Sequence, residues 1–183
     1  MVKCCNTGCC GDIEESQINE DDKIKIDFLY LDLNICNRCQ GTDEGLNEAI
    51  ADVEKVLKLT DKEVIVNKVH INNKEMAIKY KFVSSPTIRI NGKDIQMEVR
   101  ESLCESCGEL CGDNVDCRVW VYKGKEYTIP PKAMIIDSIL HEVYGDNKIL
   151  LDSEHNKEAY ELPENLRNFF QSVEKNYKLN KDH

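Results

Sequence analysis

The stretch Lys23–Leu59, KIKIDFLYLDLNICNRCQGTDEGLNEAIADVEKVLKL, decides the fold that we expect for this chain. In its first part, apolar residues alternate at the two-residue period of a strand, and leucines fill the other face. A strand that is apolar on both faces belongs inside a sheet that is covered on both sides. Its second part repeats apolar residues at helical spacing. The apolar positions are Ile24, Ile26, Phe28, Leu29, Tyr30, Leu31 and Leu33 in the strand, and Leu46, Ala49, Ile50, Val53, Val56 and Leu57 in the helix.

Two cysteines, Cys36 and Cys39, lie where this strand ends and the helix begins. A helix N-terminus carries partial positive charge and unpaired N–H groups, which favour a thiolate over a thiol. Two intervening residues let the second sulfur reach the first, so that a disulfide can form and reopen. We expect Cys36 to be an exposed nucleophile and Cys39 its resolving thiol; Arg38 adds favourable charge, whereas Asp43 and Glu44 oppose it. The alternatives for this pair are half of a zinc site and two inert core thiols.

Length and charge narrow the class of protein. The chain has 183 residues, enough for one domain with a sizeable core, and a formal net charge of −10. Such a surface repels nucleic acid and anionic membranes, so we expect neither as a partner. No stretch reaches the apolar length of a membrane helix, and the N-terminal residues do not resemble a signal peptide. We therefore expect a cytoplasmic protein without membrane insertion; the sequence does not indicate its oligomeric state.

The ten cysteines are many for a protein of a reducing compartment, where they indicate metal binding or redox exchange rather than structural disulfides. They form three groups: Cys4, Cys5, Cys9 and Cys10; Cys36 and Cys39; and Cys104, Cys107, Cys111 and Cys117. Thiolates prefer soft or borderline ions such as zinc, copper(I), trivalent arsenic or mercury(II). Zinc or another soft metal is therefore the cofactor that we expect, and no organic cofactor is indicated.

The first group lies in residues 1–22, which continue into an acidic run and have nothing to bury in a core. We expect a flexible arm whose four thiols either bind a soft ion or relay thiol exchange. The alternative is a tail in which the cysteines are incidental. The vicinal pairs Cys4-Cys5 and Cys9-Cys10 resemble those of arsenic metallochaperones and arsenite-responsive proteins, and this resemblance covers the arm alone.

The third group lies in residues 101–117, which we expect to form a Cys-rich loop inserted into the fold. Gly108 and Gly112 permit turns that point sulfurs inward. Four thiolates suit tetrahedral zinc, although the spacing is tighter than that of the usual zinc ribbon. The alternatives are an iron–sulfur cluster, two disulfides, or a thiol pair that exchanges with Cys36–Cys39.

The rest of the chain supplies further elements. We expect strands at 63–71, 87–90 and 118–122, and helices at 74–82, at 163–177 and from Thr128 to the stop at Gly145. Pro86 must begin the strand at 87–90, because proline cannot donate to a strand ladder, and the Ser85–Pro86 bond is either cis or trans. Asn91-Gly92 then forms a two-residue hairpin turn.

This order of strand, C-x-x-C, helix, strand, helix, X-Pro-Thr strand and Asn-Gly hairpin resembles the thioredoxin superfamily over residues 23–100 and a closing helix. The whole pattern is most similar to an uncharacterised thioredoxin-like bacterial family. The resemblance implies that Cys36 attacks, that Cys39 resolves, and that Pro86 packs beside the sulfurs and shapes partner binding. This chain has Asn37-Arg38 between its cysteines, where thioredoxin itself has Gly-Pro.

Together these observations predict an α/β protein of thioredoxin-like fold, with a mixed central sheet flanked by helices. The expected organisation is an arm at 1–22, a domain at 23–145 with the insertion 101–117, and a charged extension at 146–183 with one helix.

Two functions fit this organisation. The first is a thiol–disulfide oxidoreductase in which Cys36 attacks a protein or small-molecule disulfide and the outer thiols pass electrons on. It requires Pro86 near Cys36 and a sulfur within reach of a partner. The alternative is a binding protein or chaperone for zinc, arsenite or mercury, in which the three thiol groups pass an ion along and the scaffold is only a frame.

Overall fold

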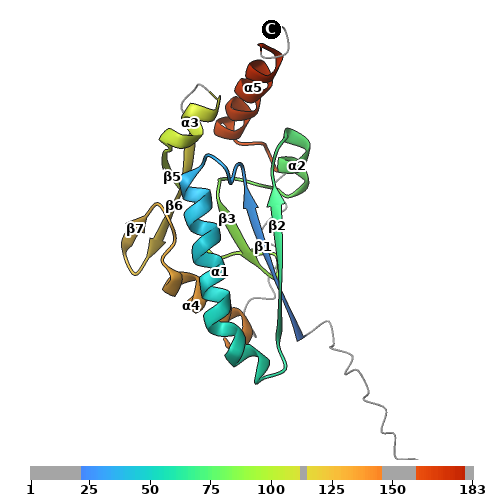
Figure 1. Cartoon of the computed structure of the whole chain (residues 1–183), viewed down its shortest axis with the longest axis vertical. Helices are drawn as coiled ribbons and strands as arrows, with labels where there is room; N and C mark the ends of the chain where they lie inside the picture. The colour runs from blue at the N-terminus through green and yellow to red at the C-terminus, as the bar shows by residue number, and fades with distance from the viewer. Residues whose placement is uncertain (1–21, 112–114, 146–159, 180–183) are drawn as a thin grey trace, which may run out of the picture.

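The computed structural model describes residues 22–111, 115–145 and 160–179 and contains two sheets. The larger sheet has the strand order β2-β1-β3-β4 (Figure 1). Its strands are β1 (Lys23–Tyr30), β2 (Glu63–His70), β3 (Thr87–Ile90) and β4 (Lys93–Asp94). The central strand β1 pairs parallel with β2 and antiparallel with β3, so the sheet is mixed, as the sequence predicts.

The turn between β3 and β4 has the residues that its backbone demands. Asn91 and Gly92 have φ angles of 49° and 83°, the left-handed region that Gly and Asn tolerate best. The hairpin predicted at Asn91-Gly92 is therefore confirmed. Pro86 immediately precedes β3, and the Ser85–Pro86 peptide bond is cis.

Two helices cover one face of this sheet, namely α1 (Asn37–Lys58) and α4 (Lys132–Tyr144) (Figure 1). Alternate residues of β1 point toward them and are buried with the apolar face of α1. The buried residues of this cluster are Ile24, Ile26, Phe28, Leu46, Ala49, Val53, Leu57, Ile88, Ile90, Trp120, Met134, Ile135 and Ile139. Most of the apolar residues that repeat at helical spacing after Cys39 therefore form the face of α1 that packs in the core.

Among the residues that the structure describes, the opposite face of the sheet is covered only near the carboxyl end of β1. There Leu29 is buried among residues of α2 (Lys74–Lys79) and α5 (Glu164–Leu179), whereas Lys25 on the same face is exposed. The expectation of a strand covered along both faces is thus met at one end alone. The covered end is the one from which the chain continues into Cys36.

The Cys-rich insertion is folded, and the expectation of a loop is wrong. It forms β5 (Arg100–Leu103), α3 (Glu105–Cys111) and β6 (Asp116–Tyr122), and β7 (Lys125–Tyr127) completes a second sheet of order β5-β6-β7. Counted as apolar residues, the cysteines at 104, 107 and 111 fall at helical spacing, and this pattern favours α3. The insertion therefore presents Cys107 from α3 and Cys117 from β6, and Cys104 directly precedes α3.

Helix α5 docks against the domain. Leu166, Phe169 and Phe170 are buried in one apolar cluster with Cys36 and other cysteines. Its Asn165 side chain also bonds the backbone of β6: Nδ2 donates to the Asp116 carbonyl at 2.7 Å, and Oδ1 accepts from the Asp116 N–H at 3.1 Å. The C-terminal helix thus helps to enclose the region around Cys36.

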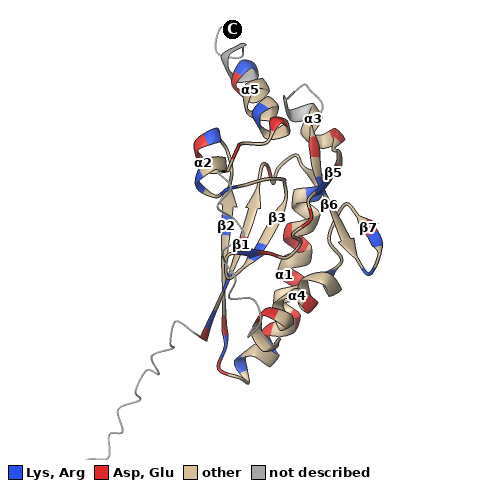
Figure 2. Cartoon of the chain, turned by 180° about the vertical axis from the view of Figure 1, so that it is seen from behind, with Lys and Arg blue, Asp and Glu red and all other residues tan. Residues whose placement is uncertain are grey.

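Acidic side chains lie along the outer parts of α1 and α4 (Figure 2). They are Asp43, Glu44, Glu48, Asp52, Glu54, Asp137 and Glu142. Several face lysines, as where Lys132 Nζ lies 2.9 Å from Asp52 Oδ2. Apart from the largely buried Asp43 and Glu142, these charges form a solvated surface. Within the described ranges, no helix combines the length and the apolar character that crossing a membrane requires.

Candidate metal centre

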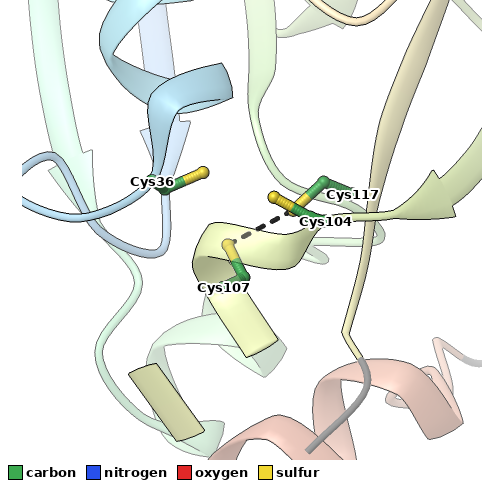
Figure 3. Close-up of side chains that lie close together, drawn as sticks. All are labelled: Cys36, Cys104, Cys107 and Cys117. Atoms are coloured by element: carbon green, nitrogen blue, oxygen red, sulfur yellow. Dashed lines mark hydrogen bonds between the residues drawn. The ribbon is translucent and has the colours of Figure 1, made fainter. Parts of the chain in front are cut away.

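Four cysteine sulfurs meet at one point inside the fold (Figure 3). The sulfurs of Cys36, Cys104, Cys107 and Cys117 all lie within 4.8 Å of one another. All four residues are buried, with exposed fractions of 0, 2, 0 and 0 %. Around a tetrahedral zinc ion with Zn–S bonds of ~2.3 Å, the sulfurs are about 3.8 Å apart. The Cys107 and Cys117 sulfurs are 3.4 Å apart, so small side-chain movements suffice to hold an ion.

Three separate elements bring these sulfurs together. Cys36 is the N-cap of α1, and its extended backbone (φ −76°, ψ 103°) directs its side chain toward the insertion. Cys104 directly precedes α3 and Cys107 lies in its first turn, where the Gly108 N–H donates to the Cys104 carbonyl at 3.0 Å. Cys117 lies on β6. The insertion therefore supplies three thiols and the strand-to-helix turn supplies the fourth.

Arg38 joins the two halves of the centre. Its guanidinium donates to the carbonyls of Ser102 at 3.3 Å, Leu103 at 2.6 Å and Cys117 at 3.1 Å. These carbonyls belong to β5 and β6, while Arg38 belongs to the first turn of α1. The planar fork of an arginine can serve several acceptors at once, whereas a lysine ammonium is a single point charge. Arg38 thus fixes Cys36 relative to Cys117.

Replacing Arg38 by lysine is expected to lower the free energy of unfolding by about 1–3 kcal/mol, because the carbonyls of two strands lose charged donors. Urea unfolding of the reduced protein measures this loss. Arg100→Lys is the matched control. Arg100 lies on β5, one of the two strands that Arg38 contacts, but it pairs with the exposed Glu98 and Glu126. Equal effects of the two variants would contradict the role given to Arg38.

Cys39 lies next to the four clustered cysteines but is not one of them. It is fully buried, and its N–H donates to the Cys36 sulfur at 3.4 Å. Its own sulfur lies 3.3 Å from the Ser85 hydroxyl oxygen. Because Ser85 precedes the buried, cis-bonded Pro86, the proline loop packs beside the C-x-x-C turn.

The thiols perturb one another strongly. Hydrogen bonds from Cys104, then Cys107 and Cys117, hold the pKa of the Cys36 thiol far below its ordinary value. Those from Cys107 and Cys117 lower the pKa of Cys104 to about 6. The pKa values of Cys107 and Cys117 are raised, chiefly by Cys104, and that of Cys39 is raised by Cys36 and by burial. At neutral pH the centre therefore combines thiolates that accept with thiols that donate, and a soft cation can replace the shared protons.

The expectation that Cys36 is exposed is wrong. Both Cys36 and Cys39 have an exposed fraction of 0 %. Both residues are buried by tertiary packing, because the insertion and α5 lie in one apolar cluster with the end of β1 and the start of α1. A protein disulfide therefore cannot reach either sulfur in this conformation.

The structure describes only part of the predicted thiol set. Cys104, Cys107 and Cys117 come together as the spacing of the third group suggests, and Cys36 joins them. Cys111 is the last residue of α3, and its side chain lies outside the described residues, as do Cys4, Cys5, Cys9 and Cys10.

Sequence reasoning missed three contributors to the site, namely Cys36 as a fourth partner of the insertion thiols, the Arg38 clamp and the Ser85 contact. No spacing rule connects residues so distant in the chain. The one available signal was the spacing of the four insertion cysteines, which is tighter than that of the usual zinc ribbon and so leaves room for a ligand from elsewhere in the chain.

A comparison with protein families gives a match over most of the described chain. The model of the family described as "Domain of unknown function (DUF2703)" matches residues 24–139, a span that contains all four clustered cysteines. This match covers more than half of the chain, which therefore belongs to the DUF2703 family. No curated protein and no solved structure matches the chain.

Proposed function

We propose that this member of the DUF2703 family is a soft-metal binding protein that holds one thiophilic ion between Cys36, Cys104, Cys107 and Cys117. The observation that carries the proposal is the convergence of these four sulfurs, from α1, α3 and β6, within 4.8 Å of one another. When bound, a zinc ion would satisfy four buried thiolates at once. Four protein ligands leave no open position, and this argues for holding an ion rather than for catalysis on it.

The surroundings favour a cation in this place. Four thiolates around a divalent ion leave two negative charges in a buried site, which is costly without compensation. Arg38 brings a guanidinium to the Cys117 carbonyl at 3.1 Å, and the N-terminus of α1 begins directly after Cys36. Positive charge from both sources opposes the excess negative charge. If the four cysteines were inert apolar thiols, the site would contain no negative charge for Arg38 and the N-terminus of α1 to oppose.

The proposed scaffold is thioredoxin-like. Its support is the strand order β2-β1-β3-β4, the C-x-x-C at the start of α1, and the cis Ser85–Pro86 bond whose serine contacts Cys39. On this scaffold the position of the first redox cysteine would serve as a metal ligand.

A thiol–disulfide oxidoreductase is the second candidate. It is favoured by Cys39, which lies in the first helical turn after Cys36 and donates its N–H to the Cys36 sulfur at 3.4 Å. The complete burial of both residues counts against exchange with a bulky disulfide. We therefore rank metal binding first.

Titration with cobalt(II) and zinc tests the choice. The sample is the reduced full-length chain with Cys4, Cys5, Cys9, Cys10 and Cys111 replaced by serine, so that only the described thiols bind metal. We expect one ion per chain and the spectrum of tetrahedral cobalt–thiolate coordination. In this background Cys36→Ser should weaken binding by at least about 100-fold, because a primary ligand costs more than the 10–100-fold typical of outer partners.

Cys39→Ser is the matched control, since Cys39 is equally buried in the same turn but lies outside the group of four. It should bind cobalt with nearly unchanged affinity. Absence of stoichiometric binding, or equal losses in the two variants, would count against the metal centre. Reductase-coupled disulfide reduction that disappears in Cys36→Ser would instead support the oxidoreductase.

A further inference from the structure

One cysteine belongs to two groups at once. Cys36 is part of the four-thiol centre and also the first residue of the Cys36–Cys39 pair. We propose that small peroxides oxidise this pair to a disulfide and thereby release the bound ion, so that the centre is a metal site under redox control. The inference rests on the proposed function and adds a condition for release.

The geometry of the turn permits the disulfide. Positions three apart along a helix have Cα atoms about 5 Å apart, by the rise and radius of the helix. Disulfides need Cα separations of roughly 4.4–6.8 Å. Cys39 already approaches Cys36 through its N–H, which lies 3.4 Å from the Cys36 sulfur. A rotation of two side chains therefore suffices, without movement of the backbone.

Cys39 is the thiol that the metal leaves available. The other three cysteines near Cys36 would be engaged by the ion, whereas the Cys39 sulfur faces the Ser85 hydroxyl at 3.3 Å. It is fully buried beside Cys36, so a sulfenic acid formed on Cys36 would meet this thiol before it meets bulk solvent thiols. The second cysteine of the motif thus acquires a role that metal binding alone does not give it.

The reaction balances with hydrogen peroxide as the oxidant. The Cys36 thiolate attacks one peroxide oxygen, the O–O bond breaks, and Cys36 becomes a sulfenic acid while hydroxide leaves and takes up a proton. The Cys39 sulfur then attacks the Cys36 sulfur, the S–O bond breaks, and water leaves with the Cys39 proton. The pair loses two electrons, and one peroxide becomes two molecules of water.

Burial selects the size of the oxidant. Cys36 has an exposed fraction of 0 % and Cys104 one of 2 %, so a molecule little larger than water has better access than a glutathione disulfide. After oxidation only Cys104, Cys107 and Cys117 remain as thiolate ligands. An ion that prefers four sulfurs is then held by three, and its affinity falls.

The test uses the serine background described above, loaded with one zinc ion per chain. Zinc release after addition of hydrogen peroxide is followed with a chromogenic chelator, and disulfides are mapped by mass spectrometry. We expect release of one zinc, a Cys36–Cys39 disulfide, and recovery of zinc binding after thiol reduction. Cys39→Ala and, as a second variant, Cys39→Ser should release zinc at least about tenfold more slowly than the parent protein. The reason is that both variants lose the neighbouring thiol, which is present at high effective concentration.

Each outcome separates the two proposals. Failure to load zinc before oxidation would overturn the metal site and the redox control together. Loading followed by release from both Cys39 variants as fast as from the parent protein would overturn the redox control alone. A disulfide between Cys107 and Cys117, whose sulfurs are 3.4 Å apart, would likewise overturn the role of Cys39 and leave the metal site standing. Faster release with glutathione disulfide than with peroxide would contradict the inferred selection by size.

Discussion

Zinc at a thousandfold excess over its dissociation constant is expected to raise the melting temperature of the reduced protein by roughly 8–16 °C. An ion that binds only the folded state at this excess contributes about 4.1 kcal/mol, and each kcal/mol shifts the midpoint of a chain of this size by about 2–4 °C. The effect should be large because the ion links α1 to α3 and β6, which follow much later in the sequence. Scanning calorimetry with zinc and with chelator measures the shift.

The matched variants are again Cys36→Ser and Cys39→Ser in the background without the outer cysteines. Cys36→Ser should lose most of the zinc-dependent shift, while Cys39→Ser should retain it, because only Cys36 belongs to the group of four sulfurs. Magnesium should give no shift, since it prefers oxygen ligands. A full shift in Cys36→Ser would mean that the stabilising ion sits elsewhere in the chain.

Replacement of Asp94 by asparagine should lower the free energy of unfolding by about 3 kcal/mol, the lower end of the cost of leaving a buried charge without its partner. Arg118 is 1 % exposed and bonds Asp94 twice, from Nη1 to Oδ1 and from Nη2 to Oδ2, both at 2.8 Å. Its guanidinium also lies 5.2 Å from the centre of the Trp120 ring. Urea unfolding of the reduced, metal-free protein gives the free energy directly.

Glu126→Gln is the control for Asp94→Asn. Glu126 of β7 pairs with Arg100 of β5 at 2.9 Å, in the sheet that also contains Arg118. Both side chains of this pair are exposed, so water replaces the lost partner. We expect no measurable change in the unfolding midpoint of this variant. Similar losses in the two variants would show that burial does not decide the strength of these ion pairs.

Local patterns predicted most elements of the larger sheet and the helices around it. The alternation in β1, the helical spacing in α1 and the Asn91-Gly92 turn depend on neighbours in sequence, and each agrees with the structure. The helix expected at 74–82 ends at Lys79, because the chain turns at Lys81, whose φ is 45°. The sequence predicts a loop for the insertion because the apolar residues spaced at helical period in 104–111 are mostly cysteines, which also suggest metal ligands in a loop.

The sequence by itself determined that a dithiol begins a helix after a buried strand, that a strand starts next to Pro86, and that more thiols follow in the insertion. These facts follow from periodicity and from the backbone limits of proline and glycine, which act between near neighbours. Only the tertiary structure decided that Cys36 is buried with Cys104, Cys107 and Cys117. The reason is that packing of α5 and the Arg38 bonds to β5 and β6 act between segments that no local pattern connects.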